Sequence, residues 1–389
     1  RDIIISKVIP IKENRNNHEK VIKYEDQSRI YRTKEETYID KNYIDRNGDG
    51  YNFAKVRVRT MRQPVIGDKF SCYTPDHDVL TTEGWINVAN ITKDHAVASL
   101  INENTMIYQY PQEVMEYDCN EDVYEINTAQ ISLKVTKNHR MWVGSRDGSN
   151  FKIKRAEECY GKRWTYMKNC ENWIPDFNKE YPKELKLNDN KTAPTHFLIY
   201  DENSKIVCEL DINAWIKFFG IWIAEGCAYK NETNKNSYID VSAHKDRVKL
   251  VLDDIADILE WKWCKISEKR ENRKQHINAS YRIFNKYIVN YMLPLSVGAI
   301  NKSLPEWCWY LTKSQSELLL VSMELGDGHI MKNGTPRYDT SSIKLANDYQ
   351  RLCLHAGFSA NLYLKYEAGH ESYCEPRDEI FKQTVDAWR

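Results

Sequence analysis

The sequence predicts a multidomain chain in three parts: a β-rich fragment at residues 1–71, an all-β domain at 72–205, and an α/β domain with duplicated αββαββ units at 206–389. The first boundary is a change in amino-acid composition, because a basic segment ends at Ser71 and a Thr- and Asp-rich segment begins at Cys72. Short apolar runs separated by turn residues continue to about residue 200, which favours β-strands. From about residue 210, two apolar helical segments of similar design recur. Each ends in Gly and is followed by strand-like and then helical patterns, which indicates a duplication.

The composition limits the classes of function. The chain has 389 residues, with 56 Lys and Arg against 56 Asp and Glu, so any nucleic-acid contact must come from local basic patches. The most apolar run starts at Trp215, contains Lys217 and is too short to cross a bilayer. Because no signal peptide opens the chain, we expect a soluble intracellular protein. The ten cysteines lack metal-ligand spacing, so all except Cys72 are expected to be free or buried thiols in a reducing compartment.

The first part begins with an apolar strand expected over residues 3–8 and ends in the segment YNFAKVRVRTMRQPVIGDKFS. In that segment Val56, Val58 and Thr60 alternate with basic residues, which predicts a half-buried strand with a basic face. Between these strands, DRNGDGYNFAKV spaces Asp45, Asn47 and Asp49 like a calcium-binding loop. The twelfth position is Val56, where a bidentate Glu is needed, so we expect a plain turn between two strands.

The stretch CYTPDHDVLTTEGW offers a nucleophile beside a peptide bond. The thiol of Cys72 can reach the preceding carbonyl of Ser71 through a five-membered ring, and its attack would convert the amide to a thioester. The departing nitrogen needs a proton, so an acid/base group must converge on this bond. Downstream, LKVTKNHRMWV places Thr136 and His139 at a strand end and a turn, where a hydroxyl and an imidazole could be aimed at one amide.

These two segments resemble the first and second splicing motifs of inteins, which implies an all-β Hint domain. Carried over by position, Cys72 would be the first intein residue and nucleophile, and Ser71–Cys72 the scissile bond. Thr136 and His139 would activate that bond, with His139 protonating the amide nitrogen. Asp76 occupies a polar position of the motif with a less defined role. The change in composition at Ser71 would then mark the junction of two genes.

Two helical segments, FFGIWIAEG and LVSMELGDG, carry small residues four apart, with Gly220 and Ala224 on one and Ser322 and Gly326 on the other. Such faces let helix backbones approach closely. An acid stands at the end of each segment, Glu225 and Asp327, where the helix dipole disfavours negative charge. Packed symmetrically, the helices would bring the two carboxylates together and suit two divalent metals that clamp a phosphodiester. The glycines that follow, Gly226 and Gly328, are expected to end the helices in the left-handed conformation.

Both segments resemble the paired motifs of LAGLIDADG (DOD-type) homing endonucleases, which are often nested in inteins. NKSLPEW resembles the Lys-x-x-Pro motif between the repeats and implies a catalytic role for Lys302, while RYDTSSIKLANDYQRLCLHAGFSANLYL resembles the strand-helix-strand after the second motif. Ser322 and the bulky Trp222 depart from the family pattern. The resemblance implies two Mg²⁺ ions at Glu225 and Asp327, and a double-stranded DNA target in the uninterrupted host gene. In this family DNA lies on a saddle of strands. The implied contacts are Lys230, Lys235, Lys332, Arg337 and Tyr338, with a phosphate-binding hairpin or a solvated loop at Lys269, Arg270 and Arg273.

The first 71 residues resemble the second-largest subunit of multisubunit DNA-directed RNA polymerase, in the part that holds the RNA–DNA hybrid. Lys69 matches a lysine that this family places near the RNA 3′ end, and other polymerase subunits are implied as partners. The compartment would be the nucleus or a site of viral transcription if the host is eukaryotic or viral. The end QTVDAWR is expected to be a strand still inside the endonuclease, with no carboxyl-terminal splicing motif after it. Two alternatives stay open: a polymerase subunit with an inert insert, and a hedgehog-type autoprocessing protein that does not cut DNA.

Overall fold

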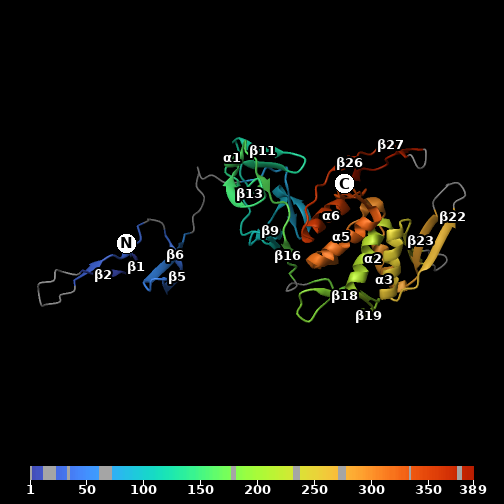
Figure 1. The fold of residues 1–389 in the computed structure, drawn as a ribbon, viewed down its shortest axis with the longest axis horizontal. Coiled ribbons are helices and arrows are strands. Elements are labelled where there is room, and N and C mark those ends of the chain that lie inside the picture. The colour runs from blue at the N-terminus through green and yellow to red at the C-terminus, as the bar shows by residue number, and fades with distance from the viewer. Residues whose placement is uncertain are drawn as a thin grey trace. The chain divides into compact units, whose positions relative to one another are not determined.

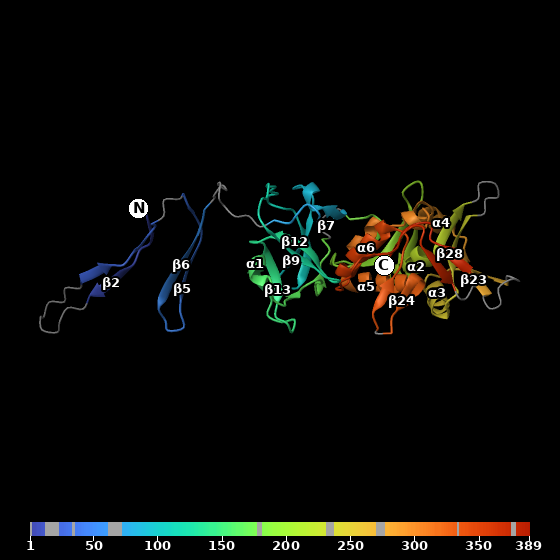
Figure 2. The same ribbon diagram turned by 90° about the horizontal axis from the view of Figure 1, so that it is seen from above.

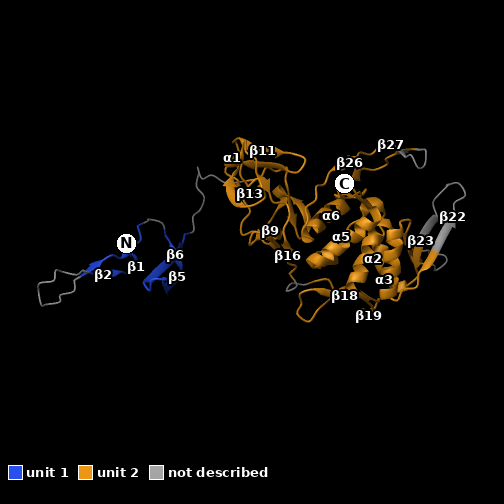
Figure 3. Ribbon diagram, in the orientation of Figure 1, with its two compact units in different colours: residues 1–69 blue, residues 70–389 orange. Residues whose placement is uncertain are grey.

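The computed structural model describes residues 2–11, 23–32, 36–60, 72–176, 181–230, 237–269, 277–332, 334–374 and 379–389. The chain forms two compact units, Arg1–Lys69 and Phe70–Arg389 (Figure 3). In the described residues no helix is both long enough and apolar enough to cross a membrane.

The first unit consists of antiparallel two-stranded ribbons. Its pairs are β1 (Ile3–Ile5) with β4 (Arg29–Ile30), β2 (Val8–Ile11) with β3 (Lys23–Asp26), and β5 (Tyr38–Arg46) with β6 (Asn52–Arg59). The single strand expected over residues 3–8 is therefore two strands with different partners. At Lys7 between them the backbone N–H donates to Ser28 Oγ (3.1 Å) instead of to a strand.

The hairpin β5–β6 confirms the expected turn. The side-chain oxygen of Asn47 accepts from the backbone N–H groups of Asp49 (3.1 Å) and Tyr51 (2.8 Å), so this polar run closes the hairpin on itself. The expected half-burial of β6 is wrong within this unit, since Val58 is 44% exposed and only Val56 is half-buried. A lone ribbon has no second layer to cover either face.

The second unit begins with a β-rich part. Its strands form a five-stranded sheet in the order β16-β10-β9-β7-β8, a hairpin β11–β12, and a three-stranded sheet β14-β13-β15. The bounds are β7 Asp78–Thr81, β8 Gly84–Asn87, β9 Val97–Ile101, β10 Thr105–Gln109, β11 Val123–Asn127, β12 Ser132–Thr136, β13 Arg140–Gly144, β14 Lys152–Arg155, α1 Ala156–Cys159, β15 Thr165–Tyr166 and β16 Asn172–Trp173; the 3₁₀ turn η1 is Val88–Asn90.

The remainder of this unit contains two halves in which helix, strand, strand, helix, strand, strand follow in the same order. The first half comprises α2 Ile212–Glu225, β20 Gly226–Lys230, β21 Ser237–Ser242, α3 Asp246–Ile258, β22 Cys264–Lys269 and β23 Ile277–Ile283. The second comprises α5 Lys313–Asp327, β24 Gly328–Ile330, β25 Pro336–Tyr338, α6 Ile343–His355, β26 Leu364–Tyr366 and β29 Ala387–Trp388, with a hairpin of β27 Glu371–Cys374 and β28 Glu379–Lys382 before β29. The connection between the halves holds α4 Lys286–Met292 and three 3₁₀ turns, η2 Leu293–Leu295, η3 Ala299–Asn301 and η4 Glu306–Tyr310.

The sheets of the two halves correspond. The first half has the antiparallel order β20-β21-β23-β22. In the second half β24 pairs with β25, a bridge joins Thr340 to Trp388 of β29, and β29 pairs with β26. The segment QTVDAWR thus contributes a strand to the second half, as expected. In both views the strands β7 to β13 gather at one end of the unit and α2, α3, α5 and α6 at the other (Figures 1 and 2).

A three-stranded sheet of β17 (Leu185–Leu187), β18 (Pro194–Tyr200) and β19 (Ile206–Asp211) precedes α2. Phe197 of β18 is fully buried and stacks on Trp215 of α2, with ring centroids 4.4 Å apart. The boundary expected after residue 205 therefore falls inside the β18–β19 hairpin, and the structure groups β17 and β18 with the helices. The apolar side chains of β18 and α2 are buried in one continuous core, which decides the grouping.

Candidate functional site

The first candidate site is the backbone around Cys72. The Cys72 N–H, which belongs to the Ser71–Cys72 peptide bond, donates to Thr136 Oγ1 (3.0 Å), and the Thr136 N–H donates back to the Cys72 carbonyl (3.1 Å). An antiparallel bridge between Tyr73 and Val135 continues this pairing. The backbone of Cys72 and Tyr73 is thus held against the end of β12 by these hydrogen bonds and this isolated bridge. Ser71 itself lies outside the described residues.

The thiol of Cys72 is half-buried, and this loss of hydration raises its pKa above the ordinary value. The nearby thiol of Cys119 raises the pKa of Cys72 further, since two thiolates repel each other. The Cys72 thiol is therefore mostly protonated at neutral pH, so it could act as a nucleophile only if a base accepted its proton.

His139 follows Thr136 in a tight turn, in which the His139 N–H donates to the Thr136 carbonyl (3.0 Å). Its ring lies edge-on to the ring of Tyr73, with centroids 4.4 Å apart. Burial lowers the pKa of His139, and the charge of Arg140 lowers it further. The imidazole is therefore neutral near pH 7, and its Nδ1 is buried without a hydrogen-bond partner in the described structure. A neutral imidazole with a free nitrogen can accept a proton.

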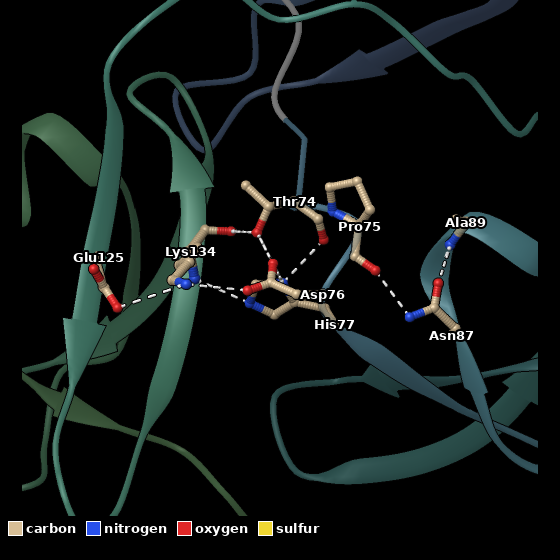
Figure 4. A network of polar contacts seen from close by, with 8 residues as sticks. All are labelled: Thr74, Pro75, Asp76, His77, Asn87, Ala89, Glu125 and Lys134. Carbon is tan, nitrogen blue, oxygen red and sulfur yellow. Dashed lines mark hydrogen bonds and ion pairs between the residues drawn. The ribbon is translucent and has the colours of Figure 1, made fainter.

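Asp76 belongs to a polar network close to Cys72 in the sequence (Figure 4). Its carboxylate accepts from the Thr74 hydroxyl and from Lys134 Nζ (3.1 Å), and these bonds lower the pKa of Asp76 to about 2. His77 accepts at Nε2 from the Lys134 N–H (2.9 Å) and donates at Nδ1 to the Thr74 carbonyl (3.0 Å). These contacts tie the loop after Cys72 to β12, and Asp76 helps to hold this loop in place.

The second candidate site lies where α2 and α5 end side by side. The predicted close approach of their small residues is confirmed, because a methyl group added at Gly220 would lie 2.5 Å from the Cβ of Ser322. A methyl group at Gly326 would overlap the Cβ of Ala224 in the same way. The helix backbones thus touch along two matched pairs of small residues, which carries Glu225 and Asp327 to the same end of the helix pair.

The carboxylates of Glu225 and Asp327 influence each other electrostatically. The pKa of Asp327 is raised to about 6, first because protein atoms replace water around its carboxyl and then because Glu225 is negative. Asp327 nevertheless remains exposed at the rim of the site, so it can contact a ligand from solvent. Two carboxylates that repel each other beside the carbonyl ends of two helices attract cations strongly.

Lys302 supplies one such cation. Its Nζ donates to the carbonyl groups of Ile223 (2.6 Å) and Ala224 (3.1 Å) at the end of α2. Burial lowers the pKa of Lys302, while the charges of Asp327 and Glu225 act in the opposite direction. The backbone of this residue is held from α6, since the buried Ser342 hydroxyl donates to the Lys302 carbonyl (2.7 Å).

Lys245 and Arg247 were not found by sequence reasoning. Lys245 Nζ lies 3.4 Å from Glu225 Oε1 and also donates to the Gly326 carbonyl, while Arg247 donates to the carbonyls of Glu324 (3.5 Å) and Gly328 (3.4 Å). Both stand at the start of α3, within the segment SAHKDRVK. No sequence signal points to them, because their contacts to α5 depend on how the two halves pack.

The expected left-handed conformation of Gly226 and Gly328 is wrong. Their backbones are extended, with φ −113° and ψ 164° at Gly226 and φ −82° and ψ 152° at Gly328, because β20 and β24 begin directly at these residues. Glycine is needed for space instead, since a methyl group would overlap Trp222 at the first position and the Glu324 carbonyl at the second.

Of the residues expected to contact nucleic acid, some are exposed or half-buried, one is buried and the others are not described. Lys230 and Lys332 are exposed, and Arg337 is half-buried on β25. Tyr338 is wrong as a surface contact, since the alternation of β25 turns it inward, where it is 6% exposed and stacks on Tyr349 at 4.5 Å. Outside the described residues lie Lys69, Lys235, Arg270 and Arg273, and the side chain of Lys269 is not described.

The donor set at the helix ends is compatible with Mg²⁺. Glu225 and Asp327 offer carboxylate oxygens beside backbone carbonyls, which are the hard ligands that this ion prefers. Within the described ranges, no group of three or more His, Cys, Asp and Glu side chains is placed to hold a metal. A Mg²⁺ ion here would therefore complete its coordination with water and with oxygens of a bound phosphate.

Comparison with known proteins finds a family match at the N-terminal segment. Residues 1–77 match the family described as RNA polymerase Rpb2, domain 6. A protein named DNA-directed RNA polymerase II subunit RPB2, from Meyerozyma guilliermondii, is 40% identical over 18% of this chain and 6% of its own length. The matches support a fragment of the RNA polymerase second-largest subunit at the start of this chain.

Two further relatives match most of the chain. The ATP-dependent Clp protease proteolytic subunit of Chlamydomonas moewusii is 36% identical over 306 residues, which cover 76% of this chain and 28% of that protein. The DNA-directed RNA polymerase subunit beta C-terminal section of Stigeoclonium helveticum is 28% identical over 376 residues, which cover 84% of this chain and 32% of that protein. The chain thus spans less than a third of the length of each relative.

Proposed function

We propose that residues 72–389 are a self-splicing intein with an embedded DNA endonuclease, inserted after Ser71 into a fragment of the second-largest RNA polymerase subunit. The comparisons favour an insertion. The Clp protease relative covers 76% of this chain, whereas the polymerase family model covers only residues 1–77, so most of that similarity must lie after residue 77. A segment shared by proteins named for a protease and for a polymerase is expected of an element that enters unrelated hosts.

The hydrogen bond from the Cys72 N–H to Thr136 Oγ1 carries the splicing proposal. In the acyl shift, Cys72 Sγ forms a bond to the Ser71 carbonyl carbon, and the bond from that carbon to the Cys72 nitrogen breaks. The thiol loses one proton and the departing nitrogen gains one. A neutral His139 is suited to accept the first and return the second, while Thr136 holds the amide in place.

Thiol-induced cleavage tests this step. Incubation of the whole chain with excess dithiothreitol should release residues 1–71 as a separate fragment, because the thiol intercepts the thioester at Ser71. A Cys72→Ala variant should stay intact under the same conditions. Equal amounts of intact chain in both samples would count against the acyl shift.

The matched pair of helices supports the endonuclease. Glu225 and Asp327 would hold two Mg²⁺ ions, which when bound neutralise the charge that develops on a phosphodiester during hydrolysis. Lys302 places an ammonium group at the end of α2, and exposed basic residues such as Lys230 and Lys332 would contact DNA phosphates. The expected substrate is double-stranded DNA of the host gene without the insertion.

A Mg²⁺-dependent cleavage assay on a plasmid with the uninterrupted polymerase coding sequence tests the nuclease. Glu225→Gln should abolish cutting, and a plasmid that already carries the insertion should resist it. An uncut plasmid with the wild-type protein would favour the two alternatives, an inert insert or a hedgehog-type protein that processes itself without DNA cleavage. Thiol cleavage at Cys72 would distinguish between those two.

The first unit would act in the host polymerase, a nucleotidyltransferase, where it would contact the RNA–DNA hybrid and other subunits in the nucleus or at a site of viral transcription. Its apolar side chains favour docking, since Ile44 is 81% exposed and Ile39 is 64% exposed. Pull-down with polymerase subunits should therefore depend on these side chains, and Ile44→Asp should reduce capture.

A further inference from the structure

Glu225 and Asp327 lie at the ends of α2 and α5, and each of these helix ends contacts a lysine from a different part of the chain. Lys302, from the connection between the halves, binds the carbonyls at the end of α2. Lys245, from the start of α3, donates to the Gly326 carbonyl at the end of α5 and lies 3.4 Å from Glu225 Oε1. Each helix end therefore has its own ammonium group, although only Lys302 belongs to a sequence motif.

Lys245 stands at a position that is locally unfavourable. It is the N-cap residue of α3, where its side chain accepts no bond from the helix backbone. Ser, Thr, Asp and Asn are preferred there, and a positive charge opposes the helix dipole. The corresponding helix of the second half, α6, has the preferred arrangement, since Ser342 Oγ accepts from the Leu345 N–H (3.1 Å). The unfavourable N-cap position of Lys245 is offset by its contacts, because the Lys245 ammonium lies beside the Glu225 carboxylate and the Gly326 carbonyl at the end of α5.

The contact between the Lys245 ammonium and Glu225 is partly open to solvent, so a competing cation can reach it. The side chain of Lys245 is 42% exposed and that of its partner Glu225 is 25% exposed, so the pair sits at the rim of the site. Lys302 is more enclosed and is fixed by two carbonyls. A divalent ion that binds Glu225 Oε1 would compete with Lys245 for that oxygen, whereas the contacts of Lys302 are to backbone carbonyls of α2.

We propose that Lys245 is the internal counter-ion of the Glu225–Asp327 pair, that Mg²⁺ displaces it, and that the released ammonium then positions a DNA phosphate. This inference rests on the proposed endonuclease for its last step, but its first two steps concern metal binding alone. Removal of the Lys245 charge should therefore strengthen Mg²⁺ binding and weaken productive DNA binding at the same time. A lysine with a merely structural role would not produce these opposite effects.

The test compares Lys245→Met with Lys249→Met in the whole chain. Methionine keeps most of the aliphatic stem. Lys249 is a matched control on the same helix, since its side chain pairs with Asp246 (2.8 Å) and, among the described residues, makes no ion pair or side-chain hydrogen bond to the ends of α2 and α5. The Mg²⁺ concentration that gives half of the maximal rise in Tm is measured for each variant. We expect it to fall about fivefold in Lys245→Met, as for a partly exposed ion pair. It should stay at the wild-type value in Lys249→Met and in Lys245→Arg.

DNA cleavage at saturating Mg²⁺ gives the second readout. Lys245→Met should raise the KM for the target plasmid more than it lowers kcat, and Lys245→Arg should restore it. An unchanged or higher Mg²⁺ midpoint in Lys245→Met would overturn the counter-ion, as would a wild-type protein whose Tm does not respond to Mg²⁺. If the Mg²⁺ midpoint falls in Lys245→Met but neither the wild type nor any variant cuts DNA, the role of Lys245 as counter-ion is supported and the proposed endonuclease is wrong.

Discussion

The contact between Gly220 and Ser322 allows a prediction in which two physical effects have opposite signs. Alanine at position 220 should stabilise α2 by about 1 kcal/mol if helix propensity alone decides. In the structure, however, the added methyl would lie 2.5 Å from the Ser322 Cβ and 3.1 Å from backbone atoms of Leu319 and Met323. Since the first distance is shorter than carbon atoms tolerate, the helices must move apart.

Overpacking of this kind costs roughly 1 to 3 kcal/mol. We place Gly220→Ala at the upper end, because backbone atoms of α5 also resist the methyl group. After subtraction of the propensity gain, the free energy of unfolding of the second unit should fall by about 2 kcal/mol. In a Ser322→Gly background the same change should be nearly neutral, because the obstructing Cβ is gone. The coupling between the two positions is therefore on the order of 2 kcal/mol.

Urea unfolding followed by tryptophan fluorescence measures both effects, since Trp215 and Trp222 lie on α2. Val321→Ala is a control on α5, because Val321 is 48% exposed and its truncation should change stability little. A Gly220→Ala protein that is more stable than wild type would refute the close approach. So would an equal loss of stability in the Ser322→Gly background, since the cost would then arise elsewhere.

Three further predictions concern the two sites. If the proposed acyl shift occurs, Thr136→Val should slow thiol-induced cleavage at Cys72 by roughly 10²-fold, since the Cys72 N–H loses its acceptor while the shape is kept; the rate of fragment release measures it, and an unchanged rate would remove Thr136 from the reaction. The raised pKa of Asp327, about 6, means that the metal-free fold gains stability as the pH falls through 6 towards 4. The difference in Tm between Asp327→Asn and wild type should therefore shrink from pH 7 to pH 5, and a constant difference would argue against the shift. The lowered pKa of Asp76, about 2, has the opposite sign, so its contribution is present above pH 4 and is lost towards pH 2; Asp76→Asn and wild type should converge in Tm over that range, and a persistent gap would show that the carboxylate charge is not what matters.

The sequence predicted the contacts that depend on local pattern. The spacing of Gly220 and Ala224 against Ser322 and Gly326 was sufficient to predict close packing, because small residues four apart must share one face of a helix. Cys72 and Thr136 could be associated through the resemblance of their motifs, and the structure adds the hydrogen bond between them.

The remaining features depend on tertiary structure. Lys245 contacts α5 only because α3 packs across the two halves, so nothing near it in the sequence marks it. Tyr338 is a polar aromatic residue in a short strand, and the sequence did not reveal which face of β25 is covered. The grouping of β18 with the helices likewise depends on where Phe197 is buried.

Helix α6 connects the Lys302 region to the β-rich part of the second unit. At its start Ser342 holds the Lys302 carbonyl, and at its end the buried His355 accepts from or donates to the Tyr108 hydroxyl (3.0 Å) of β10 and stacks on Trp173 of β16 at 4.0 Å. Arg351, also buried, donates to the same Tyr108 hydroxyl (3.1 Å). Loss of the Tyr108 hydroxyl would remove a hydrogen-bond partner from both the buried Arg351 and the buried His355, so the contact between α6 and β10 is costly to break. We therefore expect the β-rich part and the helical part to unfold together and not as independent modules. If residues 72–389 carry the proposed endonuclease and its activity is lost through mutation, we expect the packing of α6 to be retained, because Arg351 and His355 tie α6 to β10 and β16 of the β-rich part.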